Sequence, residues 1–179
     1  MIISDDISKI TKNKKRLENI LRVKIIIQEN EISVEGIPED EYIAEKVLEA
    51  IDFGFPISVA LLIKHEDFLF EILDIKKYTR RKDLETIRAR IIGKGGKTLK
   101  TLNTLTECNF EIKNNNVGII GSPELIKNAQ DAVILIIQGS KQANVYTYLE
   151  KHHIEPIFDL GLKEKKKPKR KRPGEDSNL

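Results

Sequence analysis

The sequence predicts an α+β protein made of two copies of one small unit, each with a three-stranded antiparallel sheet and helices on one face. Three observations lead to this prediction. The chain matches itself at a fixed offset, and both halves show the same order of helical and strand patterns. Its 179 residues also suffice for two cores of about 70 residues, a size at which small domains gain from packing together.

The internal match defines the domain organisation. A shift of 85 residues places GIPE at 36–39 on GSPE at 121–124, and it places Gly54 on Gly139. Two copies are too few for a solenoid, so the match indicates a duplicated domain. The expected parts are a first domain over residues 1–72, a second over 73–150 and a basic tail over 151–179.

The second copy shows two helices separated by glycine. Apolar residues at helical spacing predict a helix over 84–92, and leucines at the same kind of spacing predict another from residue 97 to residue 106. The cluster Gly93-Lys94-Gly95-Gly96 interrupts them. A strand is expected before this pair of helices, near residues 70–75.

A hairpin and a long helix complete this copy. Residues 110–112 alternate apolar and polar side chains, as a half-buried strand does, and residues 117–120 supply its partner. The asparagines at 114–116 favour a turn because Asn tolerates left-handed backbone angles. Ser122 followed by Pro123 is typical of a helix start, and Gly139 suits the end of that helix.

The first copy follows the same order with one departure. Strands are expected over 23–27 and 32–34, and a helix over 39–53, with residues 1–10 standing for the first strand and helix. Between Ile10 and Leu17, where a glycine cluster would stand, the sequence is TKNKKR. A turn that depends on glycine is therefore not expected in the first copy.

Charge divides the chain in the same way. Residues 1–72 carry a net charge of −6, whereas residues 73–162 carry +4. Residues 76–100 are the most basic part of the second copy, with ten Lys or Arg and two acids. A polyanion would be attracted to the second copy and repelled by the first. The run KEKKKPKRKR at 163–172 has no apolar set and is expected to be disordered.

Several function classes lack support in the sequence. No run of about 18 apolar residues is present, so no membrane span is expected. The single cysteine, Cys108, fits a reducing compartment and a buried position. The three histidines lack metal-ligand spacing, and no nucleophile–base pattern is visible. We therefore expect no metal, no cofactor and no catalytic residue.

One enzymatic alternative is a P-loop-like NTPase. Gly96-Lys97-Thr98 imitates the end of the phosphate-binding loop of P-loop NTPases. The full motif needs a glycine at the position of Ile91, and it needs a strand where the pattern of residues 84–92 predicts a helix.

The glycine cluster and its flanks carry a family resemblance. The sequence RIIGKGGKTLK at 90–100 resembles the I-I-G-x-x-G core of type I KH domains. The wider sequence RIIGKGGKTLKTLNTLT…VGIIGSPELIKNAQDAV…GSKQANVYTYLE resembles the archaeal relatives of the partner-of-Nob (Pno/Dim-type) small-subunit assembly factors, with Krr-type factors as more distant kin. The resemblance covers roughly residues 5–150 and is strongest in the second copy.

The resemblance implies two tandem type I KH domains of order β-α-α-β-β-α, the first degenerate. It implies a noncatalytic factor that holds single-stranded rRNA near the 3′ end of small-subunit rRNA, while the first domain serves as a protein or interdomain interface. Implied partners are a Nob-type endonuclease and the alpha subunit of translation initiation factor two. A translation adaptor that acts mainly through a protein partner is the alternative. We expect a monomer, cytoplasmic if archaeal and nuclear or nucleolar if eukaryotic.

A glycine turn of this kind suits RNA for a physical reason. Glycines let the main chain approach a phosphate, and the N–H groups at the start of the following helix favour negative charge. KH loops clamp the backbone of about four nucleotides in this way. Lysines beside the turn would add charge, and apolar side chains would form the walls that receive bases. The candidate RNA-binding residues are Arg88, Arg90, Ile92, Gly93, Lys94, Gly95, Gly96, Lys97, Leu99, Lys100 and Ile112.

Overall fold

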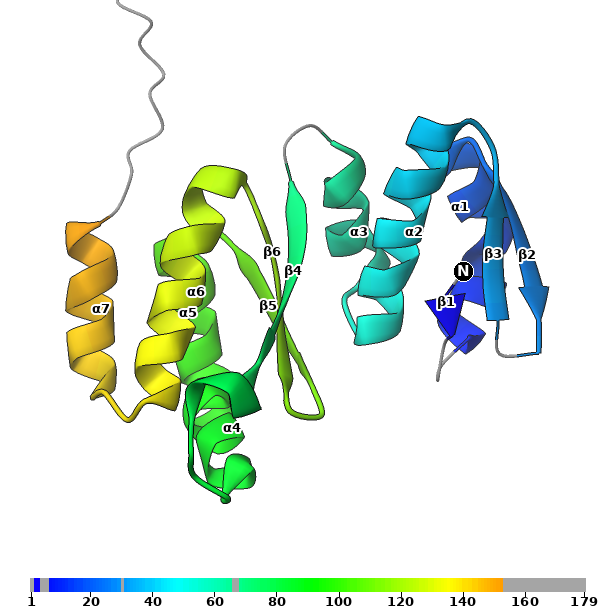
Figure 1. Cartoon of the computed structure of the whole chain (residues 1–179). Coiled ribbons are helices and arrows are strands. Elements are labelled where there is room, and N and C mark those ends of the chain that lie inside the picture. Colours follow the sequence, from blue (N-terminus) through cyan, green and yellow to red (C-terminus); the bar gives the residue numbers. More distant parts are fainter. Residues whose placement is uncertain (1, 4–6, 30, 66–67, 153–179) are drawn as a thin grey trace, which may run out of the picture.

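The computed structural model describes residues 2–3, 7–29, 31–65 and 68–152, which form two antiparallel sheets of three strands each (Figure 1). The first sheet has the order β1-β3-β2 and the second the order β4-β6-β5. Helices accompany both sheets, so the α+β class is confirmed. The predicted tail lies outside the described residues, apart from positions 151 and 152.

The first unit contains one helix before its hairpin and one after it. Its elements are β1 (Ile2–Ile3), α1 (Ser8–Leu21), β2 (Lys24–Gln28), β3 (Glu31–Glu35) and α2 (Pro38–Phe53). A short α3 (Ile57–Ala60) and a 3₁₀ turn, η1 (Leu61–Lys64), follow. These last two elements were not predicted from the sequence.

Helix α1 is continuous where the second unit has its glycine turn. Ile10, Leu17 and Leu21 are all buried along one face of this 14-residue helix. TKNKKR therefore lies inside a regular helix, which ends at Arg22 in a left-handed conformation with φ of 59°. The expectation that the first unit lacks a glycine turn is confirmed.

The second unit follows the predicted order closely. Its elements are β4 (Leu69–Asp74), a 3₁₀ turn η2 (Ile75–Tyr78), α4 (Leu84–Ile92), η3 (Lys94–Gly96), α5 (Lys97–Thr106), β5 (Asn109–Lys113), β6 (Asn116–Gly121), α6 (Pro123–Ile137) and α7 (Gln142–Lys151). The expected boundary at residue 72 falls inside β4, which pairs along its whole length with β6. Strand β4 therefore belongs entirely to the second unit.

Local backbone geometry explains the turns of this unit. Lys113 pairs with Asn116, so a two-residue loop joins β5 to β6, and Asn114 takes φ of 55° within it. Gly139 has φ of 104° just after α6, and its N–H donates to the carbonyl of Ile136. Both positions need a left-handed backbone that Asn and Gly adopt at low cost.

The sheet of the second unit lies between two helical layers (Figure 1). Val117 and Ile119 of β6 belong to the core of the second unit, whereas Ile120 belongs to the core of the first. Because successive residues of a strand point to opposite faces, β6 is buried on both sides. The second face of this sheet is thus covered by the first unit.

Three phenylalanines fill the contact between the units. Phe53 ends α2, Phe55 follows it and Phe70 comes from β4, with ring centroids 5.8–6.0 Å apart. A Cβ at Gly118 would stand 2.7 Å from the Phe53 ring and 2.8 Å from the Phe55 ring, so only glycine leaves room for them. Lys113 Nζ lies 3.0 Å from Asp52 Oδ2 and ties β5 to the end of α2.

Cys108 lies in the core of the second unit and is 2% exposed. Its burial raises the pKa of the thiol to about 11, so the group is protonated at neutral pH. The prediction of a buried core thiol is confirmed. Among the described residues, no helix combines the length and the apolar character needed to cross a bilayer.

Replacing Phe55 with alanine tests whether the aromatic contact stabilises both units. Phe55 is 1% exposed, and its loss should lower the free energy of unfolding by about 3–5 kcal/mol. Urea unfolding followed by circular dichroism would measure the change. Ile37→Ala is the control, because Ile37 is 61% exposed and its loss should cost less than about 0.5 kcal/mol. Equal stability of the two variants would contradict this account of the interface.

Candidate nucleic-acid interface

The turn between α4 and α5 is built from three glycines with left-handed backbone angles. Gly93 ends α4 with φ of 75°, Gly95 has φ of 60° and Gly96 has φ of 75°. The N–H of Gly93 donates to Ala89 O, and the N–H of Gly96 donates to Gly93 O at 3.1 Å. Residues with a Cβ disfavour these angles, so the glycine cluster fixes the shape of the turn.

The three glycines are required for different reasons. A Cβ on Gly93 would lie 2.7 Å from the backbone nitrogen of Thr98, so this position is closed by close packing. A Cβ on Gly95 or Gly96 would meet no atom within 4 Å. Gly93 therefore serves the packing of the turn, whereas Gly95 and Gly96 leave its outer side bare.

The outer side of the turn presents donors and positive charge. Lys94, Gly95, Lys97 and Lys100 are all exposed. Within the described part of the chain, the backbone N–H groups of Lys94 and Gly95 have no backbone acceptor. Free N–H groups next to a helix start and three lysines form a surface that suits a phosphate.

Helix α7 holds the turn from the inner side. Gln142 Nε2 donates to Thr98 Oγ1 at 2.8 Å and to the carbonyl of Arg90 at 3.3 Å. Arg90 Nη2 in turn donates to the carbonyl of Ser140 at 2.8 Å. Gln142 thus bridges the last turn of α4 and the first turn of α5, which fixes the two sides of the glycine turn relative to each other.

Both candidate arginines are engaged within the protein. Arg88 Nη1 donates to Asn114 O and to Asn115 Oδ1, each at 3.0 Å, which ties α4 to the β5–β6 loop. Arg90 is bound to Ser140 as described above. Both guanidinium groups already donate hydrogen bonds within the protein, which hold α4 to the β5–β6 loop and to Ser140. Their positive charges nevertheless lie near the turn.

The apolar candidates differ in exposure. Ile92, just before the turn, is 38% exposed. Leu99 on α5 and Ile112 on β5 are half-buried and pack against the core of the second unit. Of the three, Ile92 offers the most open apolar surface to a base.

The basic segment before α4 is partly neutralised. Arg81 donates two hydrogen bonds to the carboxylate of Asp83, at 3.0 and 2.9 Å, and this interaction lowers the pKa of Asp83. Lys76, Lys77 and Lys82 are exposed. These lysines extend the positive surface beyond the turn.

The turn does not have the construction of an NTPase phosphate loop. A helix, α4, precedes it in place of a strand. Thr98, whose hydroxyl would have to reach a magnesium ion, is 3% exposed and bonded to Gln142. Among the described residues, no group of three or more His, Cys, Asp or Glu side chains could hold a metal ion.

Sequence reasoning missed one contributor to this site. The prediction included no helix between Gly139 and the tail, so Gln142 was not among the candidates. Val145 and Leu149, four residues apart and both buried, were the signal that could have revealed α7. The role of Gln142 itself depends on tertiary contacts, which no local pattern shows.

A glycine turn between two helices on a three-stranded antiparallel sheet, followed by a hairpin and a long helix, defines a type I KH domain. The family model described as "Eukaryotic type KH-domain (KH-domain type I)", that of the second KH domain of PNO1, matches residues 69–154. The second unit thus matches the second KH domain of PNO1, and the chain is similar to KH-domain proteins of the Pno/Dim type.

Relatives and solved structures agree with this assignment. A KH domain-containing protein of Methanocaldococcus jannaschii is 28% identical over 145 residues, which cover 77% of this chain and 64% of that protein. RNA-binding protein PNO1 of Oryzias latipes is 30% identical over 140 residues, covering 73% of this chain and 57% of the relative. The chain thus spans less than two thirds of the length of these relatives.

The crystal structure of Dim2p from Pyrococcus horikoshii superposes with a TM-score of 0.75 at 28% identity, covering 81% of this chain and 90% of that one. A second structure from the same organism, a complex of a/eIF2alpha, aDim2p and rRNA, gives a TM-score of 0.71 at 28% identity, with 78% and 81% covered.

The unequal roles of the glycines can be tested by comparing two alanine variants. Gly95→Ala meets open space, so it should cost only the left-handed backbone term of about 1–2 kcal/mol. Gly93→Ala adds a clash with Thr98 and should lower the free energy of unfolding by about 1–3 kcal/mol more. Urea denaturation of both variants measures the difference; the reverse order of stability would refute the assigned roles.

Proposed function

We propose that this chain is a noncatalytic RNA-binding factor of small-subunit maturation, which holds single-stranded rRNA near its 3′ end through the glycine turn at residues 93–96. The observation that carries the proposal is the outer side of this turn, where unpaired N–H groups and exposed lysines lie together. Relatives named as pre-rRNA-processing proteins support the rRNA class of target.

The geometry favours the backbone of a single strand over a base-specific pocket. The turn offers peptide N–H groups and lysine ammonium groups, which recognise phosphate whatever the base. The exposed Ile92 and the half-buried Leu99 beside it give apolar contact but few polar groups that could read a base edge. Affinity should therefore depend strongly on salt, since phosphate contacts release counterions.

The first unit is, in this proposal, a degenerate KH domain that serves as an interface. Its continuous α1 cannot present a bare glycine turn, and its net negative charge repels RNA. Its α2 and Phe55 already cover the second face of the neighbouring sheet, which supports an interdomain role. A protein partner on its remaining surface is the second part of the same proposal.

A translation adaptor is the second candidate function. The observation that favours it is the likeness to the aDim2p chain that was solved together with a/eIF2alpha and rRNA. The alpha subunit of initiation factor two is thus a proposed partner, and a Nob-type endonuclease remains a further one. That neighbour's complex also contains rRNA, which supports RNA holding as a secondary role of such an adaptor.

The double variant Lys94→Asp/Gly95→Asp tests the RNA site. Placing two carboxylates on the open side of the turn should weaken binding of a single-stranded oligonucleotide from the 3′ end of small-subunit rRNA at least tenfold, which is about 1.4 kcal/mol. Fluorescence anisotropy at several salt concentrations measures this affinity and its salt slope. Circular dichroism confirms that the variant is folded.

The matched control is Thr11→Asp/Lys12→Asp, which makes the same change in net charge at exposed positions of α1. This control should change the affinity less than threefold. Equal losses in both double variants would show that net charge alone governs binding. Unchanged binding by the variant of the turn would favour the adaptor function without RNA at this site.

A further inference from the structure

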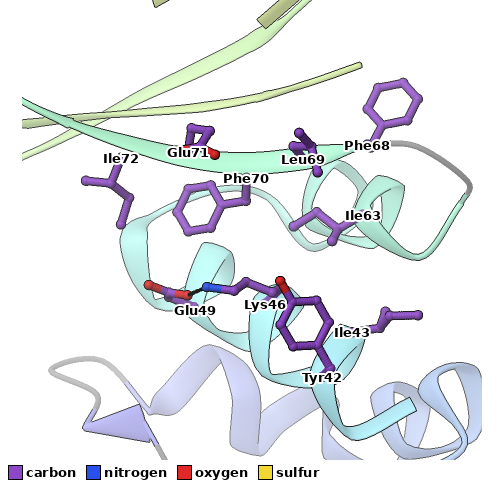
Figure 2. Close-up of a pocket in the computed structure, with 10 residues that line it drawn as sticks. All are labelled: Tyr42, Ile43, Lys46, Glu49, Ile63, Phe68, Leu69, Phe70, Glu71 and Ile72. Carbon is purple, nitrogen blue, oxygen red and sulfur yellow. Dashed lines mark hydrogen bonds and ion pairs between the residues drawn. The ribbon is translucent and has the colours of Figure 1, made fainter. Parts of the chain in front are cut away.

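A cleft of about 350 Å³ lies between α2 of the first unit and β4 of the second (Figure 2). Tyr42 and Lys46 contribute from α2, and residues 69–72 contribute from β4. Figure 2 shows Phe70 pointing from β4 toward α2, with the Lys46–Glu49 pair opposite it. The volume falls in the range of about 300–1,000 Å³ that is typical of binding sites. The glycine turn is not among the residues that line this cleft.

The cleft follows the free edge of a strand. Leu69, Phe70, Glu71 and Ile72 are consecutive, and all four line it. Successive strand residues point to opposite faces, so a surface touched by all four runs along the strand edge. Strand β4 pairs with β6 on one side, and no strand of the described residues pairs with its other side. Such an edge offers backbone groups to an added strand.

Apolar side chains are exposed around this edge. Tyr42 is 65% exposed, Ile72 43% and Leu69 42%. All three are among the large apolar side chains with the highest exposure in the described part of the chain. Their grouping in one cleft indicates a surface that binds something, since single exposed apolar residues would be scattered.

The charge around the cleft indicates what it would bind. Glu39, Asp40 and Glu41 form the first turn of α2, and Glu49 and Glu71 line the cleft itself. Lys46 is the only basic residue of the lining, and its Nζ lies 3.0 Å from Glu49. An RNA strand or a second copy of this acidic surface would be repelled, whereas a basic segment would be attracted.

We propose that this cleft binds an extended, basic segment of a protein partner, which pairs with the free edge of β4 and places alternate apolar side chains between β4 and α2. Addition of a strand to a sheet edge is a recurring mode of peptide recognition, in which backbone hydrogen bonds give affinity and side-chain pockets give specificity. The inference rests on the proposed role of the first unit as a protein interface.

Selection from a phage-displayed library of random twelve-residue peptides tests the inference on the full chain. Peptides with basic and apolar residues in alternation should be enriched, and their synthetic forms should bind in fluorescence anisotropy. Tyr42→Lys/Ile72→Lys adds positive charge at two exposed positions and should weaken this binding at least tenfold. Ile37→Lys, also exposed but outside the cleft lining, should change it less than twofold.

The remaining outcomes would overturn the inference. No enrichment, enrichment of acidic peptides, or equal loss in the control variant would each contradict it. The same selection on a chain that ends at residue 162, which lacks the basic run at 163–172, tests whether this run occupies the cleft. If peptides are selected only with the shorter chain, the cleft is occupied by the chain's own tail, which also overturns the inference.

RNA binding separates this inference from the proposed function. The cleft variant should bind the rRNA oligonucleotide as the unaltered chain does, because the lining lies in other elements than the glycine turn. The Lys94→Asp/Gly95→Asp variant should in turn keep its affinity for the selected peptide. A failure of the cleft inference would therefore appear in peptide binding alone, and a failure of the proposed function would appear in RNA binding alone.

Discussion

The close packing of Gly93 on Thr98 is the constraint on which the proposed RNA-binding surface depends. With no Cβ at residue 93, α5 can start directly beside the end of α4, and Gln142 then joins both helices through Thr98 and the Arg90 carbonyl. These contacts hold the inner side of the turn, while Gly95 and Gly96 leave its outer side bare. An open row of N–H groups at the start of a helix favours a phosphate.

Burial of β6 on both faces places the basic turn and the acidic first unit on opposite sides of one sheet. One face packs under α6, and the other receives Phe53 and Phe55 of the first unit across Gly118. The helical side of the second unit keeps the basic turn exposed, while the acidic first unit covers the opposite side of its sheet (Figure 1). The cleft at the β4 edge arises where this cover ends, so RNA and a basic peptide would meet separate surfaces of opposite charge.

Much of the second unit could be predicted because its signals are local. Helical spacing predicted α4, the asparagines predicted the β5–β6 loop, and the missing glycines of TKNKKR predicted the loss of the turn in α1. The role of Gln142 could not be predicted, since it joins residues 44 and 52 positions away in the chain. The second buried face of β6 had a weak signal, the continuous apolar stretch Val117–Ile120, which is typical of a strand covered on both sides.

The most direct test of the central claim is an NMR titration of the ¹⁵N-labelled chain with single-stranded RNA and with the same sequence carrying a neutral methylphosphonate backbone. If the turn binds phosphate through its peptide groups, the amide resonances of Lys94 and Gly95 should shift strongly with natural RNA and far less with the neutral strand, while amides of α1 stay in place. RNA binding that leaves the resonances of Lys94 and Gly95 unchanged, or shifts of equal size with the neutral strand, would contradict the claim.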